Sequence, residues 1–118
     1  MVTREDLENY AGIRRVLDDL RLRKASAERT SRLTHRKEDA KRARREADLY
    51  DAAADKLEER RMQIEAAVSG IRNADARTAV RMRYMDGKSN REIARRIYCS
   101  ERTVIRLIEA ALGELCGG

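Results

Sequence analysis

Apolar side chains recur at helical spacing near the start of the chain. Four of them are spaced by three, four and three residues, which places them on one narrow face of a helix. These are Tyr10, Ile13, Leu17 and Leu20. Thr3 is suited to cap this helix, and Asp6 follows near the positive end of its dipole. The apolar face then ends, because its continuation holds Lys24, Ala27 and Ser31.

Residues 25–47 hold almost no large apolar side chain except Leu33, so we expect a loop over roughly residues 28–36. Beyond residue 47 a second amphipathic helix is predicted. Its expected apolar face consists of Leu49, Ala53, Leu57, Ile64, Val68 and Ile71. Two helices with narrow apolar faces can pair with each other as an antiparallel hairpin. Alternatively, each can pair with a second copy of the chain as a coiled coil.

Three shorter helical patterns follow Ile71. The first has Ala76, Val80 and Tyr84 on one face, Asp75 as its expected N-cap and Gly87 after its end, where a left-handed residue is favoured. In the second, Ser89 and Glu92 form a capping box, and Ile93, Ala94 and Ile97 are expected to face inward. The third begins at Ser100, and Gly113, Gly117 and Gly118 predict that its end frays. Its apolar positions are Val104, Ile108, Ala111, Leu112 and Leu115.

The last two helices are joined by a very short turn. Only about three residues, 98–100, separate the inward-facing Ile97 from the first turn of the next helix. So short a connection makes the helices cross steeply, which is typical of a helix-turn-helix. The sequence therefore predicts an all-α fold. We expect residues 1–71 to form long helices for oligomerisation or partner binding, and residues 72–118 to form a DNA-binding domain.

Charge supports a polyanionic partner. Charged residues make up 41% of the chain and the net charge is +6, but its distribution is more informative. Residues 76–106 hold nine Lys/Arg against three Asp/Glu, and residues 21–45 hold eleven against three. No arginine-rich segment carries an apolar face broad enough to enter lipid, so nucleic acid is favoured over a membrane.

The segment GKSNREIARRIYCSERTVIRLIEAAL resembles the helix-turn-helix of sigma-factor region 4. Glu92-Ile93-Ala94 matches the first helix of that motif, and residues 100–104, SERTV, match the opening of its recognition helix. Together with the approach RYMDGKS and the long helical N-terminus, the chain is similar to phage late-gene transcriptional regulators of the ArpU/RinA kind. Many members keep glycine at the turn, where this chain has Tyr98.

A recognition helix enters the major groove with its first turn, and the preceding helix crosses the phosphate backbone. The residues expected to contact bases are Glu101, Arg102, Thr103 and Arg106. The residues expected to contact phosphates are Lys88, Arg91, Arg95, Arg96 and Ser100. Arg77 and Arg81 are weaker phosphate candidates. Ile105 either touches a thymine methyl group or packs against the N-terminal helix.

Catalysis is not indicated. His35, Cys99 and Cys116 lack metal-ligand spacing, Cys99 is expected in the core, and no nucleophile set or phosphate loop is found. We therefore expect no enzyme activity, no metal and no cofactor. Two thiols, no secretory segment and no apolar run near ~20 residues predict a soluble cytoplasmic protein outside the membrane.

The sequence thus favours a sequence-specific regulator of phage or prophage late genes. Its expected partners are double-stranded DNA, RNA polymerase and a second copy of the chain through the N-terminal helices. Two other classes stay open. One is the DNA-binding subunit of a phage packaging complex, similar to a small terminase, and the other is a structural helical protein whose arginines serve solubility.

Overall fold

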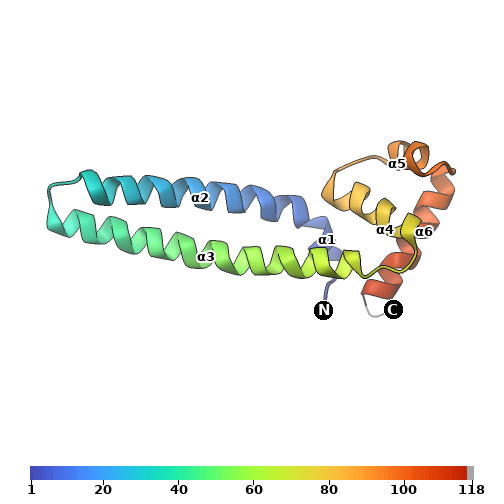
Figure 1. Cartoon of the computed structure of the whole chain (residues 1–118), viewed down its shortest axis with the longest axis horizontal. Helices are drawn as coiled ribbons and strands as arrows, with labels where there is room; N and C mark the ends of the chain where they lie inside the picture. The colour runs from blue at the N-terminus through green and yellow to red at the C-terminus, as the bar shows by residue number, and fades with distance from the viewer. Residues whose placement is uncertain (117–118) are drawn as a thin grey trace. The chain divides into compact units, whose positions relative to one another are not determined.

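A computed structural model describes residues 1–116, and all of their regular structure is helical (Figure 1). Residues 117–118, where fraying was expected, lie outside the described part. Contacts divide the chain into a terminal unit, residues 1–11 and 62–118, and a hairpin unit, residues 12–61. The elements are α1 (Arg4–Glu8), α2 (Tyr10–Leu33), α3 (Lys37–Ser69), α4 (Ala74–Val80), the π-helix η1 (Arg81–Met85), α5 (Asn90–Ile97) and α6 (Glu101–Leu115).

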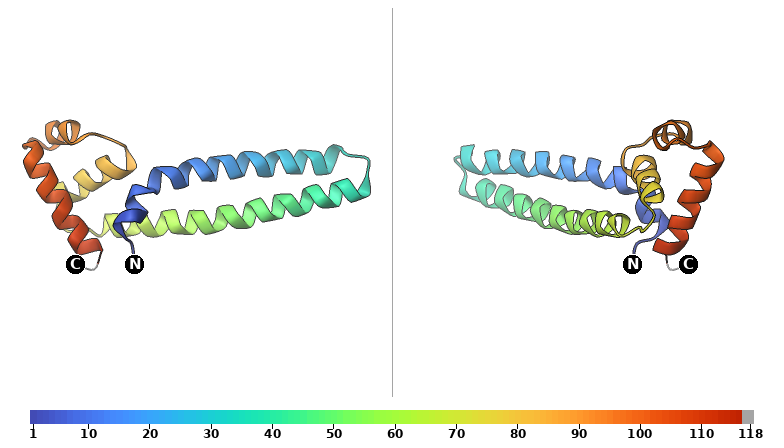
Figure 2. Two further views of the ribbon diagram at one scale, coloured as in Figure 1. Left: turned by 180° about the vertical axis from the view of Figure 1, so that it is seen from behind. Right: turned by 45° about the vertical axis from the view of Figure 1, so that its right-hand side comes forward.

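In the hairpin unit α2 and α3 run antiparallel, as both views of Figure 2 show. Cross-helix ion pairs join their stems: Lys24 Nζ lies 2.8 Å from Asp51 Oδ1, and Arg21 Nη2 lies 3.4 Å from Glu58 Oε2. The Asp51 carboxylate, through its hydrogen bond, raises the pKa of Lys24. The all-α fold and the long N-terminal helix pair predicted from the sequence are confirmed.

Two details of the hairpin differ from the sequence-based prediction. The expected loop over residues 28–36 is reduced to residues 34–36, because α2 continues to Leu33. The buried face also differs from the expected one in the first half of α3, where Leu49 is 70% exposed and Ala53 is exposed, whereas Ala43 and Ala47 are buried. Ile64 and Val68, nearer the end of α3, are buried as predicted. Two helices can pack closely through alanine, so the buried face need not carry the largest apolar side chains. The prediction placed Leu49 inside because leucine is larger and more apolar than alanine.

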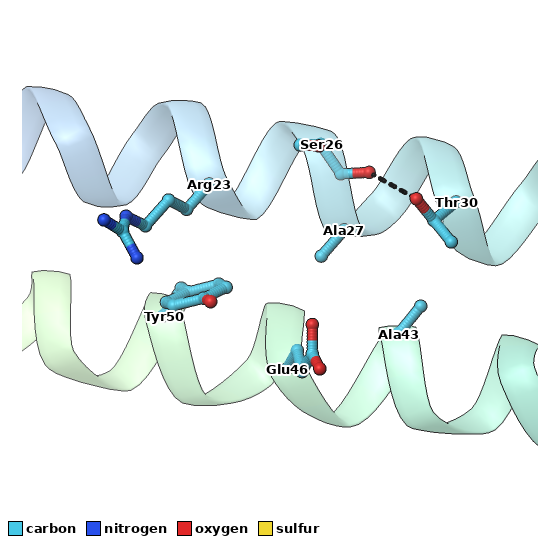
Figure 3. A pocket seen from close by; sticks show the side chains of 7 residues that line it. All are labelled: Arg23, Ser26, Ala27, Thr30, Ala43, Glu46 and Tyr50. Atoms are coloured by element: carbon cyan, nitrogen blue, oxygen red, sulfur yellow. Dashed lines mark hydrogen bonds between the residues drawn. The ribbon is translucent and has the colours of Figure 1, made fainter.

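Small side chains leave space inside the distal half of the hairpin. A cavity of ≈ 200 Å³ lies between the helices, and Figure 3 shows Ala27 of α2 and Ala43 of α3 facing each other across it. Arg23 and Tyr50 lie along the same cavity, where the Asp19 carboxylate and then the Tyr50 hydroxyl raise the pKa of Arg23. The distal half therefore buries little apolar surface.

The terminal unit is built around a fully apolar core. Its most completely buried side chains come from α1, the end of α3, α4, α5 and α6. They are Leu7, Ile64, Val68, Ile71, Val80, Ile93 and Val104. In addition, the Tyr10 hydroxyl donates a hydrogen bond to the Glu65 carboxylate. The unit thus includes residues from both ends of the chain, a different division from the predicted one at residue 71.

Local sequence signals explain where the short helices begin and end. Thr3 caps α1, as predicted, and its side chain forms a capping box with Asp6. The predicted single helix is interrupted, because α1 ends at Glu8 and α2 begins at Tyr10. The N-cap of α4 is Asn73 and not Asp75, since the Asn73 side chain accepts a hydrogen bond from the backbone of Ala76 at 2.9 Å. Asp75 instead lies in the first turn, where its charge favours the helix dipole.

The segment after α4 was predicted to be a simple α-helix but widens into the π-helix η1. The Asp86 N–H donates to the Arg81 carbonyl, five residues earlier, at 3.1 Å. Gly87 then adopts φ +69°, as its predicted role after the helix end requires. None of the helices within residues 1–116 is long and apolar enough to cross a membrane.

Candidate DNA-binding interface

The two helices of the predicted motif are defined by serine caps. Ser89 caps α5 in a capping box with Glu92, and the Ser100 hydroxyl accepts the Thr103 N–H at 3.1 Å to begin α6. Both caps are as the sequence predicted. Ile93 and Ala94 of α5 are buried, as are Val104, Ile108, Ala111 and Leu112 of α6. One face of each helix is therefore fixed in the core, which leaves the opposite face outward.

A left-handed residue makes the turn between α5 and α6. Tyr98 has φ 56° and ψ 51°, and the Cys99 N–H donates to the Ala94 carbonyl at 3.0 Å, which is the longer hydrogen bond of a Schellman motif. The turn thus has the backbone form that glycine adopts without strain, although it contains tyrosine. Cys99 is only half-buried, so its expected place in the core is wrong: the turn carries it to the edge.

Tyr98→Gly is expected to stabilise the terminal unit by about 1 kcal/mol, since a non-glycine residue in the left-handed region costs ~1–2 kcal/mol and glycine recovers most of it. The Tyr98 side chain is 95% exposed, so little packing is lost. Urea unfolding followed by circular dichroism measures the change. Tyr98→Ala is the matched control, because it removes the ring and keeps the strain. An equal gain for both variants would show that backbone strain is not the cause.

The outward face of α6 presents cations without internal partners. Arg102 and Arg106 lie four residues apart on one side of the helix, both exposed. The side chain of neither arginine forms an ion pair or a hydrogen bond with another residue of the described chain. Glu101 is exposed in the first turn, and the Thr103 hydroxyl lies 2.9 Å from that of Ser100. Of the predicted base-contacting residues, Arg102 and Arg106 are therefore the best placed for a ligand.

The predicted phosphate contacts are distributed over and around α5. Arg91, Arg95 and Arg96 are exposed, and within residues 1–116 they have no ion-pair or hydrogen-bond partner. Arg91 and Arg95 share one face, being four residues apart. Lys88 differs, because its Nζ lies 3.9 Å from Glu92 Oε2. The hydroxyl of Ser100 is already bonded at the cap.

The weaker arginine candidates serve the protein's own structure. Arg77 donates to the Ile71 carbonyl at 2.8 Å, and Arg81 donates to the Ser69 hydroxyl at 2.6 Å. Both bonds tie the end of α3 to the start of the next helices. Arg83 donates to Asn90 Oδ1 at 3.4 Å. Helical spacing alone could not separate these arginines from the outward ones, since their acceptors lie at the end of α3, in the turn after it and at the start of α5.

The N-terminal helix α1 contacts α6, which sequence reasoning had offered only as one alternative for Ile105. The Arg4 guanidinium contacts both carboxylate oxygens of Glu109, at 2.8 and 2.9 Å, and this pairing raises the pKa of Arg4. A cavity of ≈ 260 Å³ lies between these elements and is also lined by Tyr84 and Ile105. Burial raises the pKa of Tyr84, and Ile105 is 49% exposed. Ile105 and Arg4 of α1 line the same cavity. Of the two alternatives predicted for Ile105, this position favours packing against the N-terminal helix.

Metal-binding chemistry has no evident place in the described residues. No group of three or more His, Cys, Asp or Glu side chains in residues 1–116 is arranged to hold a metal ion. Cys99 and Cys116 are both half-buried free thiols.

Residues 73–115 match the family described as Sigma-70, region 4. The match covers α4, η1, α5 and α6, which are the elements that form the helix-turn-helix and its approach. The C-terminal part of the chain is therefore similar to this DNA-binding domain, as its motifs predicted. Neither a curated protein nor a solved structure matches the chain significantly.

Proposed function

We propose that this protein is a sequence-specific regulator of transcription that binds duplex DNA, acting on phage or prophage late genes. The observation that carries the proposal is the outward surface of α5 and α6, where exposed arginines stand without internal partners on a fold similar to Sigma-70 region 4. Solubility, the reason a purely structural helical protein would carry these arginines, does not require them to gather on the two helices of a helix-turn-helix.

In the proposed complex, the first turns of α6 enter the major groove. Arg102 and Arg106 hydrogen-bond to base edges, with guanine as the preferred partner because its two acceptors match the guanidinium fork. Glu101 and Thr103 line the same end of α6. The cations of α5 and its approach neutralise phosphates and fix the register of α6 on the duplex. These are Lys88, Arg91, Arg95 and Arg96, with Ser100 beside them.

Regulation by this route uses positioning and not catalysis, in keeping with the non-enzymatic region 4 family that residues 73–115 match. We propose RNA polymerase as the second partner, and a dimer formed through the N-terminal helices. Site selection from random DNA tests the proposal. A single recurrent site supports sequence-specific binding, and a two-fold symmetric site supports the dimer. Absence of duplex binding even at low salt would exclude the function.

A salt titration separates the two kinds of contact. Arg95→Ala should weaken binding to target and random duplex alike. It should also lower the slope of log K against log salt by about 0.9, because one phosphate fewer is neutralised. The slopes are measured by fluorescence anisotropy on both duplexes. An effect of Arg95→Ala on the target alone would assign this residue to base recognition and contradict its proposed place on the backbone.

A further inference from the structure

The distal end of the hairpin unit is strongly basic, whereas its α3 stem is acidic. Residues 29–45 hold eight Lys/Arg against two Asp/Glu, and residues 46–61 hold three against six. Figure 1 shows that residues 29–45 form the connected end of α2 and α3. The charge is thus concentrated where the two helices meet through residues 34–36.

Several cations of the stem have ion-pair partners within the hairpin, whereas cations of the tip do not. In the stem, Lys24 and Arg21 pair across the hairpin with Asp51 and Glu58. At the tip, the side chains of all eight Lys/Arg of residues 29–45 are exposed and lack an ion-pair or hydrogen-bond partner among the described residues. We call four of them, which gather on one side, the tip cluster: Arg32, Lys37, Lys41 and Arg44.

The tip cluster belongs to one side of the hairpin. Lys37, Lys41 and Arg44 follow one another at i, i+4 and i+7, so they form a single row on α3. Arg44 and Arg32 line the same cavity of ≈ 310 Å³ from opposite helices. Glu28 and Asp48 line this cavity as well, one turn closer to the stem, so the positive surface ends there.

Stability of the hairpin gives no reason for this arrangement. Like charges at i, i+4 oppose helix formation, and the neighbouring interface offers only Ala27, Ala43 and Ala47 as buried apolar side chains. An external polyanion would relieve the repulsion, and a row of unpaired cations complements the evenly charged phosphate backbone.

We infer that the tip cluster is a second DNA-binding surface, which contacts the phosphate backbone of duplex DNA independently of the bases read by α6. This inference rests on the proposed function, since it takes the same duplex as its ligand. The tip cluster adds affinity and salt dependence without sequence preference, and it extends the length of backbone that one chain occupies.

The test compares two triple variants of the full chain. One is Arg32→Gln, Lys41→Gln, Arg44→Gln in the tip cluster. The other is the matched control Arg14→Gln, Arg15→Gln, Lys56→Gln, which removes two arginines and one lysine from exposed, unpaired positions in the rest of the hairpin unit. Glutamine is about as good a helix former as lysine or arginine, so both should keep the wild-type helical signal and melting temperature or exceed it.

Binding to random-sequence duplex is measured as a function of salt concentration. Hydroxyl-radical footprints are recorded separately on a selected target duplex, where the chain binds in one register. The tip variant should lower the slope of log K against log salt by roughly two to three units and weaken binding at least ~100-fold near 0.1 M salt. Its footprint should also lose protected sugars, while the control changes the slope by less than about one unit. Equal slopes for the two variants, with unchanged footprints, would overturn the inference and leave the proposed function standing. A wild-type chain that binds no duplex would instead defeat the proposed function itself.

Discussion

Replacing Arg102 and Arg106 together by alanine is expected to remove most of the discrimination between a selected target and random duplex DNA. Each bidentate arginine–guanine pair contributes ~1–3 kcal/mol, so the double variant should lose about 2–6 kcal/mol, or roughly 30-fold to 10⁴-fold in specificity. The loss should be greater on target than on random DNA, since both arginines are proposed to read bases. Competition between the two duplexes measures the ratio directly.

The fold should tolerate this double change. Both side chains are exposed, and neither has a partner among residues 1–116 that would be left unpaired. Arg102 also lies in the first turn of α6, where a positive charge opposes the helix dipole. Arg14→Ala with Arg15→Ala is the matched control, because it removes two exposed arginines from α2, outside the proposed DNA-binding helices. If discrimination survived in the first variant, α6 would not be the element that reads the bases.

Structural features set by residues close together in the sequence were predicted better than features that depend on residues far apart. Serine caps, the glycine after η1 and the left-handed turn at Tyr98 are determined by residues within five positions of one another. The caps and the glycine were predicted correctly, with the exception of Asn73 in place of Asp75, whereas the conformation of Tyr98 had been left open. The buried face of α3 was only partly predicted, because alanines at the interface give a weak pattern beside an exposed Leu49.

Contacts between distant segments lay beyond the sequence patterns. Arg4 and Glu109 are 105 residues apart, and no periodicity relates them. Periodicity also does not relate Arg77 and Arg81 to their acceptors, which are a backbone carbonyl in the turn after α3 and the hydroxyl of the last residue of α3. An arginine at helical spacing looks the same in the sequence whether it faces solvent or a turn. The candidate interface could therefore be narrowed only once the helix faces were known.

Leu7→Ala is expected to lower the free energy of unfolding of the terminal unit by about 2–5 kcal/mol, as large-to-small changes at fully buried sites do. Leu7 is 0% exposed, and α1 packs against η1, so the change opens a cavity in the core that supports α6. The Arg4–Glu109 pair cannot compensate, because both side chains are more than half exposed and such pairs contribute ~0–1 kcal/mol. Apolar burial, and not the ion pair, holds α1 in place.

Leu22→Ala provides the matched control, since it makes the same chemical change at a helical side chain that is 71% exposed. Its effect should stay within about 0.5 kcal/mol. Chemical unfolding of both variants gives the comparison, and hydrogen exchange in α6 shows which unit has lost stability. Equal effects of the two substitutions would mean that α1 does not pack in the terminal unit. A selective effect of Leu7→Ala would show that the first residues of the chain stabilise the helix proposed to read DNA.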